Sequence, residues 1–153
     1  MELLDEIDLK LLTILQENGK LTTKEIAQQV HLSPTPVYER IKRLERDGVI
    51  EKYVAIVEAE KVGKSFIVFC QVTLRRHTKE IGNQFVEDIV SLKEVTECYN
   101  VSGDYDFLLK ILVRDMKHYQ SFVINELGLI DNIGSVHSTF VMGTIKHSYA
   151  VPI

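Results

Sequence analysis

The sequence predicts an α+β chain, in which a winged helix-turn-helix precedes a ferredoxin-like βαββαβ sandwich. Three observations lead to this fold class. Apolar side chains recur at helical spacing three times between residues 3 and 48, and only His31 and Leu32 separate the second segment from the third. Near Ser65 the spacing changes to that of strands. From there the predicted elements follow the order β-α-β-β-α-β.

The first two helices have sequence signals at their ends. Asp5 is expected to cap the first helix, and Asn18-Gly19 is expected to end it. Thr22 with Glu25 three residues later is the pattern of a capping box, which predicts that the second helix begins there. The apolar side chains of these two helices predict their buried faces: Ile7, Leu11, Ile14, Leu15, Ile26, Ala27 and Val30.

The third helix is expected to begin after Ser33, a good N-cap residue, with Pro34 in the first turn, where the missing N–H costs nothing. Val37, Ile41 and Leu44 recur at helical spacing and predict its buried face. The short connection before it predicts a tight helix-turn-helix corner.

The second half of the chain supplies the six elements of the sandwich. The domain boundaries predicted from these patterns are 1–50 for the helix-turn-helix domain, with a core at 23–42, then 51–64 for a strand or wing and a linker, and 65–153 for the sandwich. Gly63 is the predicted hinge region. Strands are expected at 66–74, 95–101, 107–113 and 135–145, and helices at 79–92 and 116–130.

The charge distribution favours DNA binding more than the total charge does. The net charge is −4, from 18 Lys and Arg against 22 Asp and Glu, so bulk charge gives no support to a nucleic-acid partner. The run 39–46, ERIKRLER, nevertheless places four basic residues on the third helix. Such a run is either an ordinary solvated helix face or the local basic surface that a phosphate backbone requires. The two-residue corner and the SPTP start of the helix favour DNA.

With the apolar stripe of the third helix turned inward, a short polar and basic face points outward. Arg40 lies nearer the buried stripe, so an ion pair within the fold is expected for it rather than a base contact. The predicted DNA-binding residues are Ser33, Thr35, Tyr38, Glu39, Lys42, Arg43 and Arg46.

The turn SGDYD, at 102–106, has the chemistry to hold an α-amino acid. A carboxylate can accept from an ammonium group, and the backbone N–H of a glycine can approach a carboxylate closely. An ordinary hairpin turn would use the same residue types for backbone geometry, so that alternative stays open. The predicted effector-binding residues are Ser102, Gly103, Asp104, Tyr105, Asp106, Ser138 and Thr139. Asp104 is the preferred ligand contact, and for Asp106 a structural role is the alternative.

Other functional classes have little support in the sequence. No catalytic, phosphate-binding or metal-ligand motif is present, so we expect neither an enzyme nor a cofactor. Cys70 and Cys98 lie in apolar runs and are expected to be buried free thiols. No apolar run has the roughly 20 residues that a membrane span needs, and the N-terminus MELLDEID is acidic, which favours the cytoplasm.

Two motifs resemble those of one family. LSPTPVYERIKRLERDGVI (32–50) resembles the recognition helix of the Lrp/AsnC regulators, and NVSGDYDFLLKI (100–111) resembles the turn of their effector domain. The resemblance is greatest to the leucine-responsive branch and covers nearly the whole chain. The corner before the recognition helix often carries a Gly in this family, so the resemblance implies that His31 has a left-handed or strained conformation, which His tolerates better than most residues other than Gly. It implies a transcription regulator that binds double-stranded DNA, forms a homodimer that assembles further, commonly to an octamer, and binds an amino acid between subunits.

Two alternatives to an effector-responsive regulator remain at this point. A ferredoxin-like domain also occurs as a metabolite-binding regulatory module of amino-acid enzymes, in which case the N-terminal helices would contact a partner enzyme. A ligand-independent architectural DNA-binding protein is the other alternative. The apolar runs 66–72 and 107–113 favour an assembling protein, because they offer more hydrophobic sheet surface than one small sandwich needs.

Overall fold

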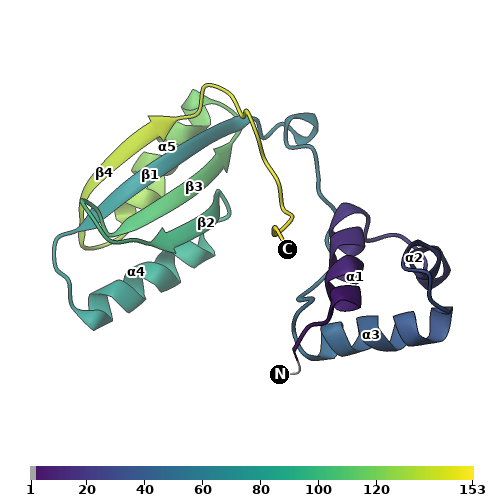
Figure 1. The fold of residues 1–153 in the computed structure, drawn as a ribbon. Helices are drawn as coiled ribbons and strands as arrows, with labels where there is room; N and C mark the ends of the chain where they lie inside the picture. Colours follow the sequence, from purple (N-terminus) through teal and green to yellow (C-terminus); the bar gives the residue numbers. More distant parts are fainter. Residues whose placement is uncertain (1–2) are drawn as a thin grey trace. The chain divides into compact units, whose positions relative to one another are not determined.

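A computed structural model describes residues 3–153 and divides into two compact units (Figure 1). The first unit comprises the chain up to Ile56 together with Lys146–Ile153, and the second comprises Val57–Ile145. The C-terminal segment Lys146–Ile153 thus groups by its contacts with the N-terminal unit, whereas the sequence predicts one domain over 65–153. Residues 1 and 2, which open the predicted first domain, lie outside the described part of the chain.

The N-terminal unit is built from three helices around one small core. Leu11, Ile26, Val37 and Leu44 are almost completely buried, which confirms the predicted apolar faces. Both expected capping interactions of the first two helices are present, because Asp5 pairs with Asp8 and Thr22 pairs with Glu25. The helices are α1 (Glu6–Glu17), α2 (Thr23–Gln29) and α3 (Pro34–Arg46).

The corner between α2 and α3 has the predicted tight geometry. His31 has a φ of 55°, which confirms the left-handed conformation expected there. Ser33 occupies the N-cap position of α3 with an extended backbone, but its side chain makes no capping hydrogen bond. Pro34 follows as the first helical residue and removes one N–H that would otherwise need a partner.

The C-terminal unit has the predicted βαββαβ order and an antiparallel sheet with strand order β2-β3-β1-β4. Its strands are β1 (Phe66–Leu74), β2 (Val95–Asn100), β3 (Phe107–Val113) and β4 (Ile133–Phe140), and its helices are α4 (Lys79–Ser91) and α5 (Met116–Asn125). The predicted ferredoxin-like fold is therefore confirmed.

Alternation along β1 and β3 separates the two faces of the sheet. Buried residues such as Val68, Cys70 and Leu109 pack with Phe85 of α4 and Phe122 of α5 in one core. The residues between them are only partly buried, as the alternating burial patterns of both strands show. The sheet therefore has one face covered by helices and one face without helices.

Three expected elements differ from the structure. Residues 51–58 form neither helix nor strand, because a single wing strand finds no partner within one chain. β4 begins and ends earlier than the predicted 135–145. α5 ends at Asn125 and is followed by a short 3₁₀ turn, Leu127–Leu129, where a Cβ at Gly128 would lie 2.8 Å from the Val123 carbonyl oxygen.

Candidate DNA-binding face and effector site

The exposed face of α3 contains nearly all the residues predicted to contact DNA. Val37, Ile41 and Leu44 are buried, so the opposite side of the helix faces solvent. Of the predicted set, Arg43 is only partly exposed, and the other residues are exposed: Ser33, Thr35, Tyr38, Glu39, Lys42 and Arg46. The face has the size and polarity of a recognition helix that enters a major groove.

Two arginines of α3 form ion pairs with two carboxylates at the N-terminal end of α1. Asp8 is completely buried and accepts hydrogen bonds from Arg40, at 2.8 Å, and from Arg43. Asp5 also accepts from Arg40, at 2.6 Å. The hydrogen bond from the backbone N–H of Asp8 lowers the pKa of Asp5, and the hydrogen bond from Arg40 lowers this pKa further. Arg40 thus has the ion pair within the fold that its position suggested, and Arg43 contributes to the same cluster.

The exposed basic residues of α3 also have acidic neighbours. Lys42 Nζ lies 2.7 Å from a carboxylate oxygen of Glu45, and Arg46 Nε lies 3.1 Å from Asp47. Glu45 raises the pKa of Lys42, mainly through this hydrogen bond. Tyr53 donates its hydroxyl to the second oxygen of Glu45 at 3.1 Å. A phosphate that binds Lys42 would therefore have to compete with Glu45, which the basic run in the sequence did not reveal.

The SGDYD turn connects β2 to β3 at one end of the sheet. Gly103 has a φ of 135°, which favours glycine, and Ser102 and Asp104 are exposed. Asp106 accepts a hydrogen bond from the Leu74 backbone N–H at 2.7 Å and lies 3.0 Å from His77 Nε2. Asp106 therefore ties the turn to β1, whereas Asp104 presents its carboxylate to solvent.

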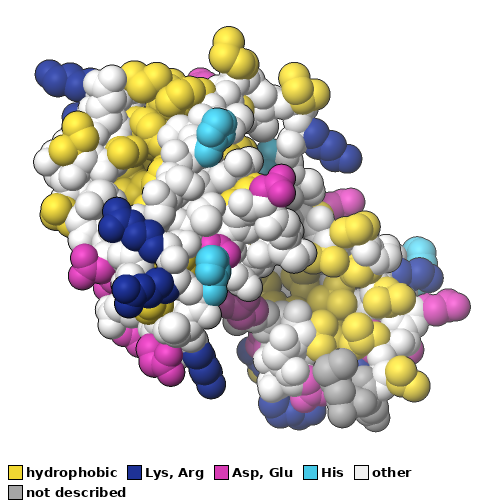
Figure 2. All heavy atoms as spheres, turned by 90° about the vertical axis from the view of Figure 1, so that its left-hand side faces the viewer, with side chains coloured by type: hydrophobic (Ala, Val, Ile, Leu, Met, Phe, Trp, Pro, Cys, Tyr) yellow, Lys and Arg dark blue, Asp and Glu magenta, His cyan; other side chains and the backbone are white. Residues whose placement is uncertain are grey.

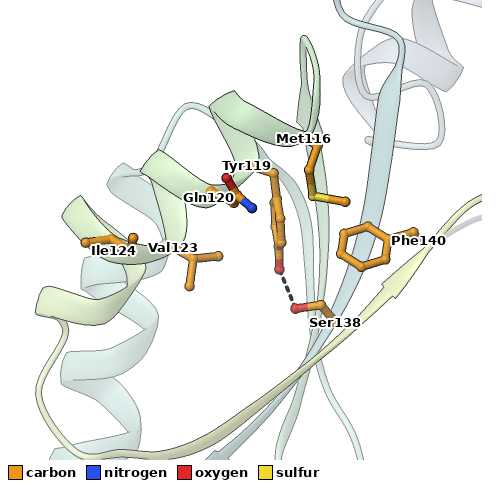
Figure 3. A pocket seen from close by; sticks show the side chains of 7 residues that line it. All are labelled: Met116, Tyr119, Gln120, Val123, Ile124, Ser138 and Phe140. Carbon is orange, nitrogen blue, oxygen red and sulfur yellow. Dashed lines mark hydrogen bonds between the residues drawn. The ribbon is translucent and has the colours of Figure 1, made fainter.

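A pocket of about 250 Å³ lies between α5 and β4 (Figure 3). The Tyr119 hydroxyl points toward Ser138 and lies 2.6 Å from its oxygen, while the thiol of Cys70 lies 2.8 Å from the same hydroxyl. Burial raises the pKa of both Tyr119 and Cys70, so the network is neutral at ordinary pH. The lining is otherwise largely apolar, from Met116, Gln120, Val123, Ile124 and Phe140.

The predicted effector residues do not come together within one chain. Phe107, next to the turn, pairs with Val72 of β1, whereas Phe140 of the pocket pairs with Val68 on the other side of β1. These positions are separated by ~13 Å along the strands and ~10 Å across them. Ser138 faces α5, and Thr139, as the next residue of the strand, faces the opposite side of the sheet.

The sequence did not single out the apolar wall of this pocket. From the sequence, Met116 is the first residue of a predicted helix and Phe140 lies within a predicted strand. Only the packing of α5 on β4 brings the two side chains together. The two cysteines are free, with Cys70 buried and Cys98 partly buried. Among residues 3–153, no group of His, Cys, Asp and Glu side chains could hold a metal ion, and no helix is long and apolar enough to cross a membrane.

A helix-turn-helix with an exposed recognition helix, together with a βαββαβ unit that has a pocket, is typical of DNA-binding regulators that also bind a small ligand. Comparison with known families agrees with this class. A model of winged helix-turn-helix DNA-binding domains matches residues 4–51, and a model of the Lrp/AsnC ligand binding domain matches residues 67–151. The chain belongs to the Lrp/AsnC family of transcription regulators.

Individual relatives support the same conclusion. The chain is 37% identical over 145 residues to the leucine-responsive regulatory protein of Escherichia coli K12, covering 95% of this chain and 88% of the relative. A transcriptional regulator of Neisseria meningitidis, solved in complex with L-Met, has a TM-score of 0.94 and 34% identity, covering 98% of this chain and 97% of the other.

An AsnC family regulator from Agrobacterium tumefaciens also has a TM-score of 0.94, with 37% identity and 97% of each chain covered. The relatives from Neisseria meningitidis and Agrobacterium tumefaciens are transcriptional regulators, and the relative from Escherichia coli is a regulatory protein. The chain is accordingly a DNA-binding transcription regulator with an amino-acid ligand-binding domain, and the regulatory module of an enzyme is not favoured.

Proposed function

We propose that this regulator binds specific DNA sites through the exposed face of α3, as a homodimer, and that an amino acid changes its assembly or its DNA affinity. The observation that carries the DNA interface is the exposed polar face of α3 opposite the buried Val37, Ile41 and Leu44. Since the partner of this regulator is DNA, we propose that the regulator acts in the cytoplasm and catalyses no reaction.

Lys42 and Glu45 are expected to have opposite effects on DNA affinity. Replacing Lys42 with Ala removes a phosphate or base contact, so affinity falls and, for a phosphate, the slope of log K against log salt falls by about 0.9. A base contact would instead cost roughly 1–3 kcal/mol and relax specificity. Glu45→Gln removes the competing carboxylate, so DNA binds more tightly. Fluorescence anisotropy at several salt concentrations measures both changes.

Lys10→Ala is the matched control, because Lys10 is an exposed cation on α1 rather than α3. DNA fragments selected from genomic DNA serve as the probe. Equal affinity of wild type and Lys42→Ala, together with an unchanged Glu45→Gln, would exclude this face of α3 as the interface.

The uncovered face of the sheet is the proposed dimer interface. Ile67 and Phe69 of β1 and Leu108 and Leu112 of β3 lie between the buried positions of their strands and are only partly buried. They form an apolar surface on the face opposite the helices. A second copy of the chain would bury this surface with the same residues, because both subunits contribute the same patch to a two-fold interface.

Further assembly, to an octamer, would use other surfaces of the C-terminal unit. On the face shown in Figure 2, yellow hydrophobic side chains reach the surface of that unit, the upper lobe of the view. Exposed apolar side chains of the pocket wall include Met116 and Ile124. Sedimentation equilibrium over a range of concentrations distinguishes a dimer from a larger assembly.

We assign the effector site to the contact between copies. An amino acid carries a charged head and a side chain, and the turn offers a carboxylate while the α5–β4 pocket offers an apolar cavity. Within one chain the two lie too far apart for one small ligand. The complex of the Neisseria meningitidis relative with L-Met supports an amino acid as the effector.

Asp104→Ala is expected to lower the affinity for L-methionine or L-leucine by more than tenfold without abolishing DNA binding. The carboxylate is proposed to accept from the ligand ammonium, and a charge-assisted hydrogen bond contributes roughly 1.5–3 kcal/mol. Titration calorimetry against the twenty amino acids, for wild type and variant, measures the loss.

Glu87→Ala is the matched control, since it removes an exposed carboxylate from α4 of the same unit. Equal affinity of wild type and Asp104→Ala would make Asp104 an ordinary turn residue. A wild type that binds no amino acid would instead favour an effector of another kind or an architectural DNA-binding protein.

A further inference from the structure

The C-terminal segment Lys146–Ile153 contacts the last turn of α1. The side-chain amide of Gln16 donates to the Val151 carbonyl oxygen at 3.1 Å, and the Val151 N–H donates to the Gln16 side-chain oxygen at 2.6 Å. One side-chain amide thus satisfies both backbone groups of one residue, as a neighbouring strand would. The segment also groups with the N-terminal unit by its contacts, although it follows β4 along the chain.

We propose that this segment is a second tether, which holds the DNA-binding unit by docking Val151 on Gln16 and thereby limits the freedom of the helix-turn-helix relative to the sheet. The first connection between the units is residues 57–65, because the chain up to Ile56 already groups with the N-terminal unit. It could extend to about 30 Å, and it contains no helix or strand beyond a short 3₁₀ turn, Glu60–Val62. One flexible connection leaves the two units free to reorient.

The second connection has a similar length. Residues 141–150 join the end of β4 to the docked Val151 and can span at most about 35 Å when fully extended. Two connections restrict both the distance and the rotation of a unit more than one connection does alone. Release of Val151 would leave only residues 57–65 as a connection.

The tether also begins at the strand that lines the pocket. Ser138 and Phe140 belong to both β4 and the pocket wall, and the chain then runs directly to Val151. A ligand that moves the end of β4 would therefore change the position from which the tether pulls on α1. This consequence rests on the proposed effector site, but the tether itself does not.

Gln16→Ala, studied in the full-length protein, tests the tether without DNA or effector. The hydrogen bond of the Val151 N–H is lost, so amide hydrogen exchange of Val151 is expected to quicken about tenfold. In ¹⁵N relaxation, the rotational correlation time of the amides in α1, α2 and α3 is expected to shorten, while that of the sheet amides stays unchanged.

Two further variants sharpen the test. Gln16→Glu keeps the acceptor for the Val151 N–H and loses the donor, so an intermediate increase in exchange is expected. Glu17→Ala, at the neighbouring exposed position of α1, is expected to change neither measurement.

Two results would overturn the proposal. Exchange of the Val151 amide that is the same in wild type and Gln16→Ala would show that the segment is not docked through Gln16. Faster exchange with unchanged correlation times would show that docking does not restrict the DNA-binding unit. Since neither measurement uses DNA or an amino acid, failure of the proposed function would be recognised separately.

Discussion

Replacing Asp8 with Ala is expected to destabilise the N-terminal unit by about 3–5 kcal/mol, because it leaves Arg40 and Arg43 without the buried carboxylate that both of them bind. The substitution also removes the hydrogen bond from the Asp5 backbone N–H to Asp8, which is half of the capping box of α1. Small domains are stable by only about 5–15 kcal/mol, so much of the unit would be unfolded. Urea unfolding followed by helical circular dichroism measures the loss.

Two comparisons separate the buried charge from other causes. Asp8→Asn keeps one acceptor oxygen and a similar volume, so a smaller loss is expected. Asp131→Ala, at an exposed position of the C-terminal unit, is expected to change stability by less than about 0.5 kcal/mol. If Asp8→Ala unfolds at the wild-type urea concentration, the cluster does not hold α1 against α3.

Phe85→Ala is expected to have a comparable effect on the other unit. Phe85 is 1% exposed, and its ring centroid lies 4.6 Å from that of Phe107, so truncation opens a cavity between α4 and the sheet. Such substitutions cost roughly 3–5 kcal/mol. Hydrogen exchange resolved by segment should show lost protection in β1, β3 and α4, together with loss of assembly.

The same experiment tests whether the two units unfold independently. Their buried cores form separate clusters, so α1, α2 and α3 are expected to keep their protection in Phe85→Ala. Val90→Ala on the exposed side of α4 is the control, with a change of less than about 0.5 kcal/mol. Equal loss of protection in both units would mean that they unfold as one.

Features that depend on local sequence were predicted well. β1 and β3 have the predicted bounds, because alternating apolar residues and nearby turn residues mark both ends of each strand. The left-handed conformation of His31 was implied by the family resemblance, because this corner often carries a Gly in that family. The order of the six sandwich elements and the buried side of α3 followed from spacing alone.

Features that depend on distant residues were not predicted. Asp8 has the sequence context of an acid in the first turn of a helix, and its burial depends on Arg40 and Arg43 from another helix. The pocket wall depends on where α5 crosses β4, and Gln16 gives no sequence signal of its contact with Val151. A sequence pattern reports the neighbours of a residue within one element, whereas these contacts arise between elements.

The position of β4 in the sheet bears on how the chain folds as it is synthesised. β1 pairs with β4 through contacts such as Val68 with Phe140, so its second neighbour emerges from the ribosome long after β1 itself. The N-terminal helices need only residues near to them in sequence and can fold early. Until β4 is made, one edge of the apolar strand β1 stays unpaired, which makes this interval the time at which a nascent chain is most prone to aggregation.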